Sequence, residues 1–219
     1  MTATTKGAED LKRVGGHPAL DFVNTVNQWV DAGTQRDYLG DFAGLLRWSR
    51  GAGLLNEREV RDITHTAFEH PNVAAGVFRD ALTLRRALHE VMQASIAERA
   101  AKPDEARLIE VWYRRAARAR GTFIDRHGRL HVGWRFPGGK QPLTLPLLQL
   151  VWSAVEFLLS VEPGRLKECP ADQGCGWIFH DVSKNRSRRW CDMGDCGNVA
   201  KARRHYARVR RMRGATKDS

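Results

Sequence analysis

All four cysteines of this 219-residue chain lie between positions 169 and 196, and the first 168 residues contain none. They form two pairs, Cys169 with Cys175 and Cys191 with Cys196, and glycines in or beside each pair allow the sharp bends that aim two sulfurs at one ion. A segment of about 50 residues buries too little apolar surface to be stable alone. The spacing therefore predicts one structural Zn²⁺ held by four thiolates.

Two other uses of the cysteines are two disulfides and four unrelated buried thiols. Disulfides require an oxidising compartment, and the N-terminal sequence MTATTKGAEDLKR lacks the apolar core of a signal peptide. We therefore expect a cytoplasmic protein that binds zinc. His180 and His205 could replace a cysteine ligand, but a surface or stacking position is the simpler expectation for both.

The sequence around the cysteines predicts a hairpin followed by a helix. Residues 177–179 and 188–190 flank a polar, turn-rich run, 181–187, which is typical of a β-hairpin. Residues 199–213 contain no Gly or Pro and predict a helix with Asn198 as its N-cap. This order, a knuckle, a hairpin and a helix at the last ligand, is the layout of a treble-clef zinc finger.

The predicted C-terminal helix has two different faces. We expect an apolar stripe to pack on the hairpin and a basic face to remain in water. The stripe consists of Val199, Ala202, Tyr206 and Val209. The basic face consists of Lys201, Arg204, Arg208 and Arg211, with Arg203 and Arg210 on its flank.

The positive charge is unevenly distributed. Of the formal net charge of +11, +7 belongs to residues 169–219, and four thiolates with one Zn²⁺ would reduce that to +5. Such density indicates contact with phosphates, so DNA is the expected partner; the alternatives are RNA, an acidic protein, or a solvated basic tail. The predicted nucleic-acid-binding residues are Lys184, Arg186, Arg188, Arg189, Lys201, Arg203, Arg204, Arg208, Arg210 and Arg211.

The run CGWIFHDVSKNRSRRWCDMGDCGNVAKARRHYARVRR resembles the zinc finger of bacterial CGNR proteins. GGHPALDFVNTV, WSRGAGLL and ALTLRRALHEVM are similar to the ABATE domain that precedes this finger in the family. The resemblance implies a zinc-binding treble clef and a role in transcription regulation. One departure is that Val199 replaces the arginine that ends the CGNR motif, and we expect it to leave the metal site intact and remove one phosphate or acidic contact.

The expected fold class is α+β, with a mainly helical, ABATE-like N-terminal domain that contains a β-hairpin and a small treble-clef-type zinc finger. We expect a disordered N-terminus (1–12), the helical domain (13–164), the finger (165–213) and a tail (214–219). Helices are predicted at about 19–30, within 37–55, and at about 56–70, 73–101, 104–120 and 147–161, with a hairpin at 121–136. No apolar run approaches 18 residues, so no membrane span is expected.

Polar residues at core-facing helix positions are the remaining signal. Asp21 and Asn24 lie three residues apart, and Arg85 or Arg86 could pair with Asp21. Two interpretations follow: a satisfied buried network, or a ligand pocket lined by Asp21, Asn24 and Arg85 in a sensor or homodimerisation domain. Scattered histidines and the absence of recognisable catalytic motifs predict that the protein is not an enzyme.

Overall fold

The computed structural model describes residues 11–27, 36–170 and 175–215, with side chains as far as residue 210. It is mainly helical, with three two-stranded antiparallel ribbons among these residues. The elements are α1 (Pro18–Val23), β1 (Val26–Asn27), β2 (Arg36–Asp37), α2 (Phe42–Gly51), α3 (Glu57–Glu69), α4 (Pro71–Ile96), α5 (Pro103–Ala119), β3 (Arg120–Ile124), β4 (Leu130–Trp134), η2 (Pro137–Gly139), α6 (Leu145–Ser160), β5 (Leu166–Glu168), β6 (Ile178–His180), η4 (Met193–Gly197) and α7 (Asn198–Ala215).

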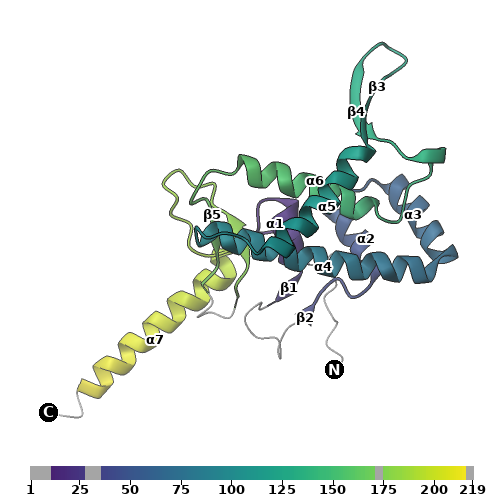
Figure 1. The fold of residues 1–219 in the computed structure, drawn as a ribbon. Helices are drawn as coiled ribbons and strands as arrows, with labels where there is room; N and C mark the ends of the chain where they lie inside the picture. The colour runs from purple at the N-terminus through teal and green to yellow at the C-terminus, as the bar shows by residue number, and fades with distance from the viewer. Residues whose placement is uncertain (1–10, 28–35, 171–174, 216–219) are drawn as a thin grey trace.

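The short helix α1 lies inside the helical body, against α4 and α6 (Figure 1). Ala19, Leu20, Phe22 and Val23 are fully buried, so four of its six residues contribute apolar surface to the core. The predicted helix from 19 to 30 is wrong in length. At Thr25 the side-chain hydroxyl donates to the carbonyl of Phe22 at 2.6 Å, and the chain turns into β1; residues 28–30 lie outside the described part.

The starts of α2 and α3, predicted from their capping residues, are confirmed. Asp41 accepts from the backbone N–H of Gly44 at 2.7 Å and begins α2. Asn56 and Glu59 form a reciprocal capping box at the start of α3. The long helix α4 begins at Pro71, two residues before the predicted start, because Pro tolerates the first turn, and it ends at Ile96 rather than 101.

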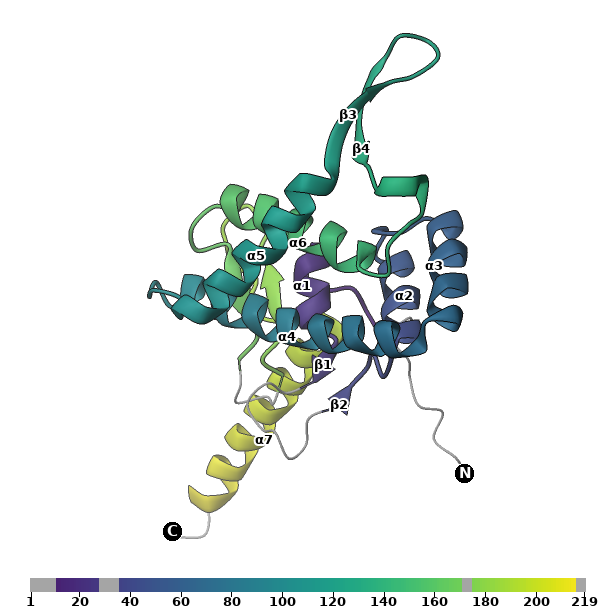
Figure 2. The ribbon, with the colours of Figure 1, turned by 45° about the vertical axis from the view of Figure 1, so that its right-hand side comes forward.

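The predicted hairpin at 121–136 is confirmed as β3 and β4, which project from the body (Figure 2). Its base is fixed where α5 passes directly into β3. The guanidinium of Arg120 lies between the rings of Trp134 and Trp152, 5.1 and 4.7 Å from their centroids. Trp152 stacks in turn on Tyr113 of α5.

The hairpin predicted within the finger is wrong. Residues 178–180 do form a strand, β6, but it pairs with β5 rather than with residues 188–190. The reason is apolar burial: Leu166 and Ile178 belong to the core of the helical body, and β5 contacts α4 while β6 contacts α1. The finger therefore shares a core with the helices that precede it in the chain.

Helix α7 leaves the body and runs away from it (Figures 1 and 2). The expectation that its apolar stripe packs on the hairpin is wrong: Val199 is 45% exposed and Tyr206 is 73% exposed, and among the α7 side chains that the structure describes (198–210) only Ala200 is buried. Asn198 is the first helical residue and not an N-cap; Asp192 instead accepts from the N–H groups of Gly194 and Asp195 before the helix. Within the described residues, we find no helix of the length and apolarity that crossing a membrane requires.

Candidate metal centre and basic surface

The four cysteine sulfurs converge on one point. Every pair of the four Sγ atoms lies within 4.8 Å, and the Cys175–Cys191 and Cys191–Cys196 separations are 3.5 and 3.7 Å. A tetrahedral zinc site with Zn–S bonds of about 2.3 Å places its sulfurs about 3.8 Å apart. The cysteines are unpaired thiols and not disulfides. The donor set and the spacing both fit one Zn²⁺, which these four residues bind.

The four sulfurs are buried or half-buried, and without a cation they cannot all be thiolates at once because their negative charges repel. Cys169 and Cys191 are buried, while Cys175 and Cys196 are half-buried. Hydrogen bonds from Cys175 and Cys191 lower the pKa of the Cys169 thiol to about 3. The hydrogen bond with Cys169 raises the pKa of Cys175, hydrogen bonds with Cys169 and Cys175 raise the pKa of Cys191, and burial raises the pKa of Cys196. A divalent cation would offset the repulsion between the thiolates and stabilise all four of them together.

A hydrogen bond, a glycine with positive φ and a capped turn orient three of the cysteine ligands. Cys169 directly follows β5, and its N–H donates to the carbonyl of Trp177 at 2.8 Å, which closes the first knuckle. Gly176 has φ of 67°, a conformation that glycine adopts without a steric penalty, and it follows Cys175 immediately. Cys196 lies in η4, the turn capped by Asp192.

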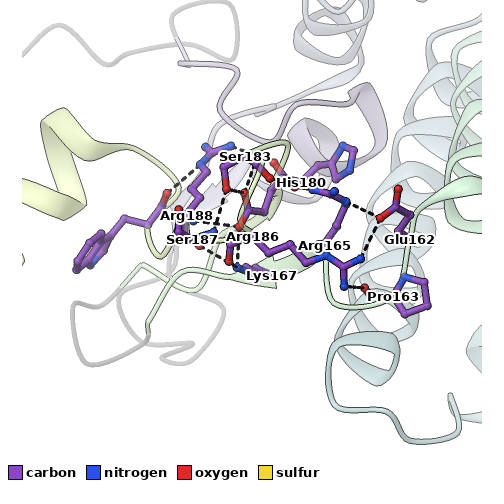
Figure 3. A network of polar contacts seen from close by, with 11 residues as sticks. Glu162, Pro163, Arg165, Lys167, His180, Ser183, Arg186, Ser187 and Arg188 are labelled. Atoms are coloured by element: carbon purple, nitrogen blue, oxygen red, sulfur yellow. Dashed lines mark hydrogen bonds and ion pairs between the residues drawn. The ribbon is translucent and has the colours of Figure 1, made fainter.

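A buried carboxylate organises the loop between the ligand pairs, and Figure 3 shows three of its partners, Lys167, Ser183 and Arg188. Asp181 is fully buried and accepts hydrogen bonds from Lys167 Nζ at 2.6 Å, from Ser183 Oγ at 2.6 Å and from the N–H of Arg188 at 3.0 Å. Burial alone would raise the pKa of Asp181, but the bonds from Lys167 and Ser183 outweigh it and hold the pKa below its usual range. The loop that joins the two ligand pairs is therefore fixed from within.

Two of the predicted nucleic-acid-binding arginines form hydrogen bonds within the chain, and Arg188 forms the most. Arg188 donates to the carbonyls of Trp190 and His180 at 3.1 Å, of Val14 at 2.8 Å, and of Cys191. Its guanidinium also covers the ring of Phe179, 4.4 Å from the centroid. With its donors committed, Arg188 holds the finger together rather than presenting charge to a partner.

Arg186 is partly committed. It donates to Glu162 and to the carbonyl of Pro163, both at 3.1 Å (Figure 3). The remaining members of the predicted set whose side chains are described are exposed: Lys184, Arg189, Lys201, Arg203, Arg204, Arg208 and Arg210. Arg211 lies beyond the described side chains.

An open groove of about 360 Å³ lies where α7 leaves the finger. Trp190 forms its wall together with Arg189, Arg203 and Arg204. The guanidiniums of Arg189 and Arg204 lie 5.2 and 5.8 Å from the centroid of the Trp190 ring. An indole flanked by arginines offers a π-face and phosphate-binding donors side by side.

The residues of the predicted N-terminal pocket have separate partners. Asp21 accepts from the N–H of Gly15 at 2.8 Å, and Asn24 bonds to the backbone of Ile178. Arg85 binds Asp37 and, at 2.8 Å, the hydroxyl of Thr25. Of the two arginines considered as partners of Asp21, Arg85 pairs with Asp37 of β2 instead. Each of the three residues tethers a different segment to the core.

The sequence interpretation missed Lys167 and Arg165. Besides Asp181, Lys167 Nζ donates to the carbonyl of Arg188 at 3.2 Å and to that of Arg186, and Arg165 donates to the carbonyls of Asp181 and Ser183 at 3.0 and 3.1 Å. Both precede the first cysteine, on or next to a short strand. An alternation of basic and apolar residues in RLKEC is their only local signal.

Two family models match the chain. The CGNR zinc finger model matches residues 165–209, and the ABATE model, described as "Putative stress-induced transcription regulator", matches residues 16–161. No curated protein matches the chain. The first match covers the four cysteines and most of α7, and the second covers the helical body from α1 to α6. The chain is therefore a member of the ABATE family that carries a CGNR zinc finger.

Proposed function

We propose that this protein is a cytoplasmic DNA-binding transcription regulator whose helix α7 contacts the duplex. The observation that carries the proposal is the position of α7, which extends away from the body with residues 201–208 and 210 exposed (Figures 1 and 2). The helix contains no acidic residue. A free basic helix of this kind has the width that the major groove of DNA admits.

Zinc has a structural role in this proposal. Four thiolates complete a tetrahedral coordination sphere and leave no position for an activated water, so we propose that the protein is not an enzyme. The treble-clef-type arrangement that we infer has the knuckle after β5 and the turn η4 as its two ligand-bearing arms. Because η4 leads directly into α7, the metal also fixes the direction of the helix.

The test is duplex binding as a function of salt. We expect the zinc-loaded protein to bind duplex DNA with an affinity that falls steeply with salt, since each phosphate contact releases counterions. The variant Lys201→Glu/Arg204→Glu/Arg208→Glu removes three cations, so the slope of log K against log salt should become shallower by about 3.

The matched control is Arg58→Glu/Arg61→Glu/Arg79→Glu, which makes the same charge change at exposed residues of α3 and α4. An equal loss of affinity in both variants would show that only net charge matters and would contradict a specific role for α7. The affinities for duplex DNA, structured RNA and an acidic polypeptide are compared at the same salt concentration. A higher affinity for RNA or for the polypeptide would show that this ligand, and not DNA, is the partner.

A further inference from the structure

A second basic element lies far from α7 in the sequence. Residues 114–140 carry eight Lys and Arg against the single acid Asp125, a formal charge of +7. Since residues 169–219 carry another +7, the rest of the chain sums to −3. The positive charge is thus confined to two segments, and the first is centred on the β3–β4 hairpin.

The two faces of this hairpin differ. On one face Phe123 stacks on His131, with ring centroids 5.3 Å apart, and covers Gly133, where a Cβ would lie 2.8 Å from the Phe123 ring. On the other face Ile124 and Leu130 are paired across the strands, with Val132 next to them. These three side chains are 69%, 69% and 59% exposed, which is unusual for adjacent aliphatic residues.

The tip is preformed and basic. The carboxylate of Asp125 accepts from the N–H groups of His127 and Arg129 at 2.8 and 3.0 Å and holds the turn closed. Arg126 and Arg129, on either side of the turn, are exposed, and neither forms an ion pair with a described residue. The hairpin therefore presents guanidiniums and aliphatic side chains together, on a base fixed by Arg120 between two tryptophans.

We propose that the β3–β4 hairpin is a second contact site for duplex DNA. Arg126 and Arg129 bind phosphates, and Ile124, Leu130 and Val132 pack against the sugars that line a groove. Two-stranded ribbons fit DNA grooves, and aliphatic side chains on minor-groove proteins contact sugars and base steps. Charge complementarity favours DNA over a second copy of this chain, because two such hairpins would bring like charges together.

The position of the hairpin extends the inference. It projects from the side of the body opposite to α7 in both views (Figures 1 and 2). Because the hairpin tip and α7 extend away from the body in opposite directions, their arrangement favours contact with separate stretches of DNA. One chain thus joins two duplex segments, or two parts of a bent one. This joining rests on the proposed contact of α7 with DNA, whereas the hairpin contact itself does not.

The experiment is a capture assay at a concentration at which sedimentation shows monomers. One duplex is immobilised, and the protein must retain a second, fluorescent duplex in solution. The hairpin variant is Arg126→Glu/Arg129→Glu, the helix variant is Lys201→Glu/Arg204→Glu/Arg208→Glu, and the control is Arg58→Glu/Arg61→Glu. Thermal unfolding checks that each variant is folded.

We expect the hairpin variant to lose at least tenfold in capture of the second duplex while it keeps binding to one duplex through α7. The control should capture as the wild type does. Capture unchanged in the hairpin variant would overturn the proposal. A second measurement, sedimentation at higher concentration, would also overturn it if the wild type is a dimer and Ile124→Thr/Leu130→Thr/Val132→Thr is a monomer with unchanged DNA affinity, since the face would then be a homodimer contact. If the helix variant binds one duplex as tightly as the wild type does and the hairpin variant does not, the proposed role of α7 fails while the hairpin site stands.

Discussion

The side-chain amide of Asn24 pairs with the backbone of Ile178 in both directions. Its Nδ2 donates to the Ile178 carbonyl and its Oδ1 accepts from the Ile178 N–H, both at 2.9 Å, and both groups are buried. Nearby, Trp177 donates to the carbonyl of Val26 at 2.8 Å, and the N–H of His180 to that of Gly15. The start of the helical body thus pairs with β6 of the finger much as a neighbouring strand would.

Asn24→Ala should therefore destabilise the whole protein. It leaves the buried N–H and C=O of Ile178 without partners, at a cost of about 2–4 kcal/mol. Urea unfolding monitored by circular dichroism measures this loss. Asn72→Ala, at an exposed position in the first turn of α4, is the control and should change stability by less than about 0.5 kcal/mol. Equal stability of the two variants would show that the pairing contributes nothing.

Cys191→Ser should reduce bound zinc from one ion per chain to almost none, because the Cys191 sulfur is one of the four that surround the site, 3.5 and 3.7 Å from those of Cys175 and Cys196. Metal analysis of protein purified without chelator gives the stoichiometry. Amide exchange should rise in β6 and at the start of α7, whereas α4 to α6 should retain their protection through their own apolar core. Asn185→Ala, an exposed change in the same loop, should keep its zinc.

His17 should make stability depend on pH. Burial, and next the nearby His180, lowers the pKa of His17 to about 4, from an ordinary value of 6.5. The unfolded chain then binds the proton more readily, so stability should be complete above pH 6.5 and fall as the pH decreases toward 4. His17→Asn keeps an N-cap for α1 and should show a weaker decrease between pH 7 and 5, by at most about 1.4 kcal/mol per pH unit.

Asn185→Ala, an exposed substitution that changes no titratable group, should retain the wild-type dependence on pH. Buried His89, whose pKa burial also lowers to about 4, contributes with the same sign in all three proteins. Parallel stability curves for the wild type and His17→Asn would contradict the assignment to His17.

Substitution of the neighbouring residues Arg188 and Arg189 should affect different properties, stability in the first case and DNA affinity in the second. Arg188→Ala should lower stability by about 3 kcal/mol, because four carbonyls lose a charged donor. Arg189→Ala should leave stability unchanged within about 0.5 kcal/mol but weaken DNA binding, since Arg189 is exposed beside Trp190. Thermal unfolding and duplex titration of both variants separate the two roles. The reverse assignment of phenotypes would contradict the role inferred for Arg188.

The sequence by itself determined the elements that depend on local chemistry. Capping residues such as Asp41 and Asn56 begin their helices because the hydrogen bonds involved span three residues. The cysteine spacing predicted the metal centre because four soft ligands on tight turns have few other stable arrangements. The period-two pattern after Gly121 predicted the β3–β4 hairpin for the same local reason.

Tertiary structure alone decided the rest, since it depends on how different segments of the chain pack together, which no local pattern encodes. β6 pairs with β5 instead of residues 188–190 because Leu166 and Ile178 are buried in the helical core. The hydrogen bonds of Asn24 connect α1 to this strand. The sequence predicted that Arg186 and Arg188 belong to a basic surface, but in the structure both donate to other residues of this chain. The sequence gives the number of charged residues, but only the packing of the folded chain decides which of them face the solvent.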